Sequence, residues 1–187
     1  MSFHPDNYKP LQNPAGSYMK LLPGDNKIRI LGDFNAKPPT AILGFIGWLT
    51  TTDAEGKPAR RPERTPPGVD LDTSKYDEKP KEFWALIVWN YGVEAIQIWE
   101  VTQRGIQNEL VSLAEDEAWK DLSEFDVSVN RSGEGLETRY SVMPKPKAEI
   151  SAEVKEAYEK SSIDLVALFS GDDPFEPRGN PLADPDF

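Results

Sequence analysis

Arginines cluster at two places in this acidic chain, whose formal net charge is −11. In the stretch VNRSGEGLETRYSV at 129–142 an arginine stands on each side of a glycine-rich turn, and KPARRPER at 57–64 holds three more within a few positions. Cationic side chains at this density indicate an anion-binding surface, with phosphate as the natural ligand. The cationic candidates are Arg29, Lys57, Arg60, Arg61, Arg64, Lys79, Lys81, Arg131 and Arg139.

Aromatic side chains recur in the apolar runs between these clusters. Flat π-faces can stack on unpaired nucleic-acid bases, at about 1–3 kcal/mol per base, and the contact tolerates any base sequence. The alternative is that these large rings fill the hydrophobic core, as most aromatic side chains in strands do. The aromatic candidates are Trp48, Trp84, Trp89, Tyr91, Trp99 and Tyr140.

The alternation of side chains along a strand predicts which rings face outward. In 95–101 the isoleucines at 96 and 98 form the more apolar register, so Trp99 is expected to point outward. In 83–91 both registers carry a tryptophan, so at least one of Trp84 and Trp89 should lie outside the core, and the pattern does not choose between them. Tyr140 alternates with Arg139 and can be interior.

The basic clusters also have plainer interpretations. The segment around 57–64 can be a solvated linker that its prolines keep extended. Arg131 and Arg139 can pair with Glu134 and Glu137 of the same turn, and surface ion pairs of this kind contribute little to stability.

Short β-prone runs separated by turn residues make up most of the chain. The turn at 133–135 is predicted to reverse the chain, because glycine adopts positive φ without steric cost. Ile106, Leu110 and Leu113 are spaced as on one face of a helix over 104–118. Residues 52–82 have few apolar side chains, so we expect a long functional loop. The predicted strands are 26–31, 41–51, 83–91, 95–102, 126–131 and 138–143.

These elements follow the order strand, hairpin, helix, hairpin, with 26–31 and 41–51 forming one long bent strand. That order predicts a mainly β protein with an OB-fold: a five-stranded, partly open barrel with one helix between strands 3 and 4, which binds ligands across strands 2 and 3 and the loops 1–2 and 4–5. The expected organisation is an N-terminal arm (1–20), an OB-fold single-stranded DNA-binding domain (21–147), a C-terminal segment with short helices (148–170) and an acidic tail (171–187).

Composition argues against several classes of function. The chain has no cysteine, so it offers no disulfide and no thiolate for a metal, and its one histidine, His4, lies outside the predicted domain. No apolar run is long enough to cross a bilayer and no signal-peptide pattern opens the sequence, which predicts a soluble cytoplasmic protein. We expect no enzymatic activity, no catalytic residues, no metal and no cofactor.

The C-terminal tail is rich in carboxylates. Such a tail can compete with nucleic acid for a basic groove, or it can simply favour solubility. A terminal phenylalanine in a charged tail has no folding role, which favours a hook for a partner protein. The predicted partner-binding residues are Asp172, Asp173, Phe175, Asp184, Asp186 and Phe187.

The body of the chain resembles the single-stranded DNA-binding proteins of tailed bacteriophages and prophages. The resemblance covers residues 18–146, and its most distinctive part is the pattern R-x-G-x-G-x-x-T-x-Y at 131–140. It implies an OB-fold that coats single-stranded DNA in replication, recombination and repair in the host bacterial cytoplasm, with an acidic tail that contacts replication or recombination proteins. Some proteins of that functional class bind zinc through cysteine and histidine, and this chain departs from them because it has no cysteine.

Three other functions follow from the same residues. An OB-fold adaptor would use the same strands and tail to bind proteins. A single-stranded RNA binder is a variant of the first interpretation, because no residue pattern reads a 2′-hydroxyl. A carboxylate nuclease would need the tail aspartates to hold Mg²⁺, and a Pro/Gly-rich tail does not preorganise a metal site.

Overall fold

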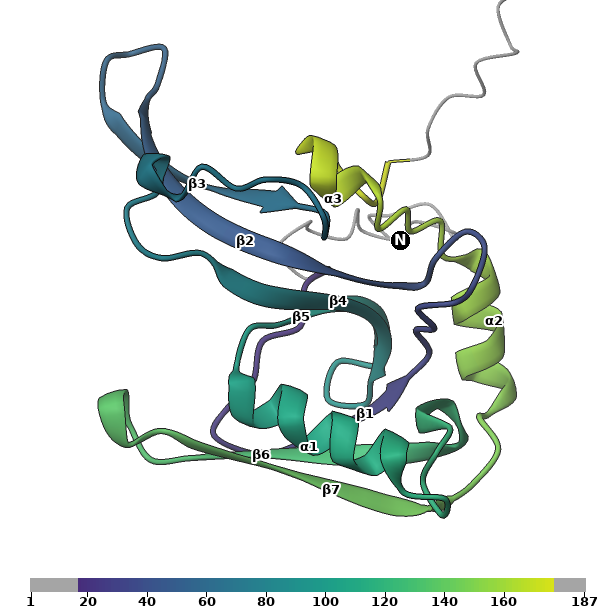
Figure 1. Ribbon diagram of the computed structural model, residues 1–187. Coiled ribbons are helices and arrows are strands. Elements are labelled where there is room, and N and C mark those ends of the chain that lie inside the picture. Colours follow the sequence, from purple (N-terminus) through teal and green to yellow (C-terminus); the bar gives the residue numbers. More distant parts are fainter. Residues whose placement is uncertain (1–16, 177–187) are drawn as a thin grey trace, which may run out of the picture.

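A seven-stranded antiparallel sheet forms the body of the protein in a computed structural model, which describes residues 17–176 (Figure 1). The strands lie in the order β3-β2-β4-β1-β6-β7, and β5 pairs with β4 off this path. The mainly β class is confirmed, but the sheet is open and has seven strands where five were expected. The strands are β1 (Gly24–Ile30), β2 (Ala41–Thr52), β3 (Pro58–Thr65), β4 (Lys81–Asn90), β5 (Ala95–Val101), β6 (Phe125–Ser132) and β7 (Arg139–Lys147).

The expected long first strand is two strands, β1 and β2. Both pair with the same partner, β4, at different stretches: β1 lies opposite 88–90 and β2 lies opposite 81–86. A connection that contains Pro38-Pro39 separates them, and proline interrupts a strand because it lacks a backbone N–H. The two strands therefore follow one another along β4 without being continuous.

The segment expected to be a basic loop contains the edge strand β3. Its prolines, Pro58 and Pro62, pair in register with Thr52 and Trp48 of β2. Proline is tolerated on an edge strand where the missing N–H would point to solvent. The linker interpretation of 57–64 is therefore wrong, because the same proline content is compatible with the edge of a sheet.

The opposite edge, β7, is also protected. The backbone N–H of Val142 donates to the carboxylate of Glu109 on helix α1 (Arg104–Glu115), and Pro144 and Pro146 remove donors farther along the strand. Unpaired donors on an edge strand invite pairing with another chain, and prolines and covering helices prevent it. Both ends of the sheet thus carry this protection.

A helix between the two strand pairs was expected, and α1 confirms it. Figure 1 shows α1 lying between the upper strands and the β6–β7 hairpin. Ile106 and Leu110 are fully buried on its inner face, as their spacing predicts. The helices are α1 (Arg104–Glu115), α2 (Ala152–Lys160) and α3 (Ala167–Ser170), with short 3-10 turns η2 (Thr73–Lys75), η3 (Leu122–Glu124) and η4 (Gly135–Glu137).

The sheet is covered on both faces, so it has two hydrophobic cores. The first core lies between the sheet and α1, where Leu86 and Trp99 pack with Leu110. The second core lies on the other face, where Phe83 and Ile98 pack against the C-terminal segment that includes α3. The central strands β4 and β5 are therefore buried on both sides.

Burial on both faces overturns the predicted orientation of Trp99. This side chain is 1% exposed, and its neighbour Gln97 is buried as well. Ile98, expected to be interior, is fully buried, but in the second core. Side chains still alternate along β5, but those on each of its two faces are buried in one of the two cores. The alternation therefore does not identify a face that is exposed to solvent. Trp89 is buried too, whereas Trp84 is half-buried.

The glycine turn between β6 and β7 forms as expected. Gly133 and Gly135 both have positive φ, and a Cβ on Gly133 would lie 2.3 Å from the carbonyl oxygen of Glu137. Glycine is therefore required at 133 by both its φ and its close approach to the chain.

The C-terminal segment folds back onto the second core. The short helices expected in 148–170 are α2 and α3, and Leu165 and Leu168 pack against the sheet. Beyond α3, Pro174 is buried, and its carbonyl oxygen accepts a hydrogen bond from the N–H of Asp164 at 2.8 Å. Packing thus continues past residue 171, where the acidic tail was expected to begin.

At the other end, residues 17–20 of the expected arm also pack on the body. The N–H of Met19 donates to Ile98 at 2.8 Å, and Met19 is buried. No helix within residues 17–176 combines the length and the apolar character needed to span a membrane.

Candidate nucleic-acid interface

The β2–β3 hairpin presents an indole ring and a guanidinium group together. The guanidinium carbon of Arg60 lies 5.0 Å from the centroid of the Trp48 ring, and Trp48 is 36% exposed. Register explains the contact: Arg60 lies opposite Thr50 and Pro62 lies opposite Trp48, so these side chains share one face of the hairpin. A ring with a cation beside it can stack a base and hold its phosphate.

Strand alternation separates the three clustered arginines. Arg60 and Arg64 lie on the face of Trp48, whereas Arg61 lies opposite Leu49 and points to the other face. The prediction that the three arginines form a single patch on a loop is therefore wrong. The reason is that residues 60–64 form a strand, in which neighbouring side chains point to opposite faces.

Two exposed cations of the hairpin, Arg60 and Lys57, form ion pairs with carboxylates. Arg60 pairs with Glu78, and its Nε lies 3.8 Å from Asp77, which also accepts a hydrogen bond from Thr50 at 2.9 Å. Lys57 pairs with Glu55 at 3.3 Å. These exposed pairs are weak, so a phosphate can exchange for the carboxylate at little cost.

A further ion pair, between Lys75 and Glu63, lies on the other face of the hairpin, because Glu63 is opposite Gly47. Hydrogen bonds from Lys75 and from the hydroxyl of Tyr76 hold the pKa of Glu63 below its usual value. The ring of Tyr76 fits against β2 because Gly47 has no side chain: a Cβ there would lie 2.5 Å from the ring.

Three further cations in or beside the β2–β3 hairpin form no ion pair within the described residues. Within residues 17–176, the side chains of Arg61, Lys79 and Lys81 are exposed and form no ion pair. Lys79 and Lys81 line a small hollow together with Trp48. Lys79 and Lys81 therefore place two positive charges at the base of the hairpin without an ion pair among the described residues, and Glu78 lines the same hollow.

Arg64 has a structural role. It is 13% exposed, forms an ion pair with Glu100 at 2.6 Å, and lies 6.0 Å from the centroid of the Phe83 ring. The pair lies on the face that the C-terminal segment covers, where Tyr18 contacts Phe175 edge to face at 5.5 Å. Burial, followed by the charge of Glu100, raises the pKa of Tyr18.

The two arginines of the β6–β7 hairpin differ in their exposure to solvent. Arg131 is half-buried, and its Nη1 donates to the carbonyl oxygen of Leu21 at 2.9 Å. Arg139 is exposed and forms no ion pair within residues 17–176, so neither arginine pairs with Glu134 or Glu137 there. Figure 1 shows this hairpin and the β2–β3 hairpin projecting from the body toward the same side of the view. Tyr140 is half-buried against the first core.

Trp84 lies on a different surface from Trp48. Its indole Nε1 donates to Glu82 at 3.1 Å, and its ring contacts Phe34 edge to face at 5.9 Å. Leu43 lies opposite Trp84 in register, so both lie on the face of the sheet opposite to Trp48. Of Trp84 and Trp89, Trp84 is the one that reaches solvent, on a different surface.

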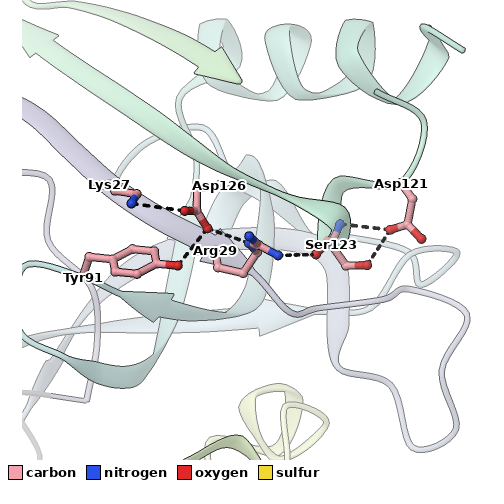
Figure 2. Close-up of polar contacts among 6 residues, drawn as sticks. All are labelled: Lys27, Arg29, Tyr91, Asp121, Ser123 and Asp126. Carbon is pink, nitrogen blue, oxygen red and sulfur yellow. Dashed lines mark hydrogen bonds and ion pairs between the residues drawn. The ribbon is translucent and has the colours of Figure 1, made fainter. Parts of the chain in front are cut away.

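Arg29 was expected on a basic outer face, and it is buried instead (Figure 2). Its Nε donates to Asp126 at 2.6 Å and its Nη1 donates to the carbonyl oxygen of Ser123 at 3.0 Å. Lys27 also pairs with Asp126, at 3.2 Å, and lies over the ring of Tyr91. These contacts give the buried guanidinium of Arg29 and the carboxylate of Asp126 the hydrogen-bond partners that water would otherwise supply.

Tyr91 belongs to the same network and is not an open stacking face. Its hydroxyl donates to Asp126 at 2.9 Å. Burial, together with that hydrogen bond and the negative charge of Asp126, raises the pKa of Tyr91 to about 12. Burial also raises the pKa of Asp126, but hydrogen bonds from Arg29 and Tyr91 outweigh it and hold that pKa below its usual value.

The acidic residues expected to bind a partner divide into two groups. Asp172 and Asp173 are exposed, and Asp173 accepts a hydrogen bond from the N–H of Phe175 at 2.9 Å. Phe175 is half-buried in the second core, so it is a packing residue there. Asp184, Asp186 and Phe187 lie outside the described residues. Within 17–176, no group of three or more acidic or histidine side chains is placed to hold a metal.

Sequence reasoning missed the acidic partners of these cations. Glu78 and Asp77 occur in the same acid- and base-rich stretch as Lys79, and that mixture was the available signal. Asp126 gave no local signal, because its partner Arg29 is 97 residues away in the chain.

A comparison of the chain with protein-family models, curated proteins and solved structures finds no match in any of the three.

Proposed function

We propose that this protein binds single-stranded DNA without sequence preference and without enzymatic activity. The observation that carries the proposal is the exposed Trp48 ring with Arg60 beside it, on a projecting hairpin whose base carries the unpaired Lys79 and Lys81. A stacking face next to exposed cations is what a sequence-tolerant single-strand binder requires. Arg61 and Arg139 add exposed positive charge on the two hairpins.

The strand pairing supports an OB-fold as the scaffold. If β1 and β2 are taken as one interrupted first strand, the elements follow the OB order. That first strand pairs with β4 and β6, the β4–β5 hairpin precedes α1, and the β6–β7 hairpin follows it. The β2–β3 hairpin is then an extension of loop 1–2, and the glycine turn is loop 4–5. Those two loops flank the ligand groove in OB-folds.

The resemblance of residues 18–146 to phage and prophage single-stranded DNA-binding proteins supports a role in coating DNA during replication, recombination and repair. The proposed partners of the C-terminal tail are replication or recombination proteins. Because Phe175 packs in the second core, the proposed partner contacts are those of the exposed Asp172 and Asp173 and of residues 177–187. The proposed location is the cytoplasm of the host bacterium.

A fluorescence titration with dT oligonucleotides at two salt concentrations tests the proposal. Stacking on Trp48 should quench tryptophan emission. The logarithm of the affinity should fall with the logarithm of salt at a slope of about −0.7 for each phosphate neutralised. Equal affinity for duplex DNA, or an affinity that does not respond to salt, contradicts the proposal. Tighter binding of a matched RNA strand would assign RNA as the ligand.

A protein-binding adaptor is the second candidate. The observation in its favour is that Lys57 and Arg60 already have carboxylate partners, which lowers the positive potential of the hairpin. Failure of oligonucleotides to form a complex, together with binding of a purified polymerase or nuclease of the same replication system, would select the adaptor.

A further inference from the structure

An apolar groove of about 930 Å³ lies on the face of the sheet opposite to Trp48. It runs between the β1–β2 connection and the C-terminal half of α1. Ile30, Leu86 and Leu110, all buried, form its floor. Its volume lies within the range of protein ligand sites, which are roughly 300–1,000 Å³.

Large apolar side chains on the walls of this groove are open to solvent. Phe34 is 43% exposed, Leu43 40% and Val111 42%, and the half-buried ring of Trp84 lies between them. These residues come from three separate elements, so no single amphipathic segment accounts for their exposure. Apolar side chains exposed together in a concave surface mark a site of interaction.

The rim of the groove is acidic. Asp33, Glu117, Asp121 and Glu124 line it, with Lys120 and Lys147 as the two bases. Lys147 is paired with Glu124, and hydrogen bonds from Ser123 hold the pKa of Asp121 below its usual value, so Asp121 is ionised at neutral pH. A phosphate chain would meet repulsion here, whereas a cationic ligand would be attracted.

We propose that this groove binds a basic amphipathic segment of a partner protein. Apolar side chains recurring at helical spacing would fill the space among Phe34, Leu43 and Val111, and lysines or arginines flanking them would meet the acidic rim. This is the recognition mode in which an amphipathic helix lies in an apolar groove. The surface goes beyond the proposed DNA interface and does not depend on it.

A fluorescein-labelled peptide of about 14 residues, with leucines at spacings of three and four and lysines elsewhere, serves as the probe. Fluorescence anisotropy with the full chain should report saturable binding that weakens as salt is raised, because the rim contributes electrostatically. A matched peptide with glutamate in place of lysine should not bind. Equal binding of the two peptides overturns the proposal.

Val111→Lys and Val93→Lys form a matched pair of variants. Both replace an exposed valine by lysine and change the charge equally, but Val93 lies in the β4–β5 turn, away from the residues that line the groove. Val111→Lys should weaken peptide binding by about tenfold or more, a loss of about 1.4 kcal/mol, and Val93→Lys should leave it unchanged. An equal effect of the two variants overturns the proposal.

A second pair covers the case in which Val111→Lys fails to fold. Leu43→Lys lies in the groove, and Leu136→Lys changes a fully exposed leucine in the β6–β7 turn. The Val111→Lys variant also separates the remaining occupants. Binding of a dT oligonucleotide that Val111→Lys weakens would assign the groove to DNA, and self-association that Val111→Lys abolishes would assign it to a second copy of this chain. Either result overturns a partner peptide as the occupant.

Discussion

Arg60 lies over the ring of Trp48, at 5.0 Å from guanidinium carbon to ring centroid, and the same guanidinium is paired with Glu78. The arginine is thus positioned for a phosphate beside a stacked base and is occupied by a carboxylate from its own chain. In the proposed complex with DNA, a phosphate oxygen would replace the carboxylate of Glu78. In the proposed function, binding of DNA at this point would exchange one anion for another.

Trp48→Ala should weaken single-stranded DNA binding. Loss of one stacking face costs about 1–3 kcal/mol, or roughly 5- to 150-fold in affinity. Trp84→Phe is the control, because Trp84 lies on the opposite face of the sheet. The measurement is a titration with labelled dT oligonucleotide. A stronger effect of Trp84→Phe than of Trp48→Ala would move the DNA path to the other face.

Glu78→Gln should tighten DNA binding at low salt. The substitution releases Arg60 from an exposed ion pair of about 0.2–1 kcal/mol, which corresponds to a gain of up to about fivefold. Glu159→Gln makes the same change on the exposed surface of α2 and should have no such effect. If both variants tighten binding equally, the gain reflects net charge and not the release of Arg60.

Asp126→Asn should lower the free energy of unfolding by about 3–5 kcal/mol at neutral pH, because it leaves the buried Arg29 without its anion. Asp70→Asn, at an exposed position, is the control. Chemical denaturation of both variants measures the difference. A loss no larger than that of the control would mean that the network in Figure 2 contributes no stability.

The same network predicts how stability depends on pH. The folded pKa of Asp126 lies below its unfolded value, so its contribution is complete above about pH 4 and is lost as pH falls through the folded pKa. The gap in stability between wild type and Asp126→Asn should therefore narrow in acid. Tyr91 acts in the opposite range: its pKa of about 12 means that its contribution is lost as pH rises from about 10 toward 12.

Removal of residues 177–187 should tighten DNA binding at low salt and leave the melting temperature unchanged, because packing described for the C-terminal segment ends at Phe175. Phe175→Ala should instead lower the free energy of unfolding by about 1–3 kcal/mol through lost contacts with the second core. Weaker DNA binding by the truncated chain would refute a tail that competes with DNA.

Gly44→Ala should destabilise the fold by about 1–3 kcal/mol through overpacking. A Cβ at this position would lie 2.4 Å from the carbonyl oxygen of Thr65 and 3.1 Å from the ring of Phe169. Gly105→Ala is the matched control, because a Cβ there meets nothing within 4 Å, and alanine in α1 should stabilise by about 0.5–1 kcal/mol. Thermal unfolding of the two variants measures the contrast.

Local patterns predicted most of the elements. The spacing of Ile106 and Leu110 identified α1, and the glycines at 133 and 135 identified the turn between β6 and β7. Gly44 and Gly47 interrupt the apolar run 41–51, and in the structure both lie where a Cβ would clash with another part of the chain. The basic segment 57–64 was the main error, because an edge strand and a proline-rich linker have the same composition.

The orientation of side chains was harder to predict than the elements themselves. Trp99 lies in a strand with two apolar faces, so its alternation with Ile98 carried no information about solvent. The prediction of the candidate site was inaccurate for the same reason. Of the six aromatic candidates, Trp48 is the exposed one on the face of Arg60.

By itself, the sequence determined a β-rich chain with two hairpins, a helix between them, and cations in the segment 57–64 and beside the turn at 133–135, because turn chemistry and periodicity act over a few residues. Only the tertiary structure decided which cations are available. Arg29 became a buried partner of Asp126, Arg64 a partner of Glu100, and Arg60 remained exposed beside Trp48. The physical reason is that the availability of a charge depends on the opposite charge that folding brings within hydrogen-bond distance, and that partner comes from a strand far away in the chain.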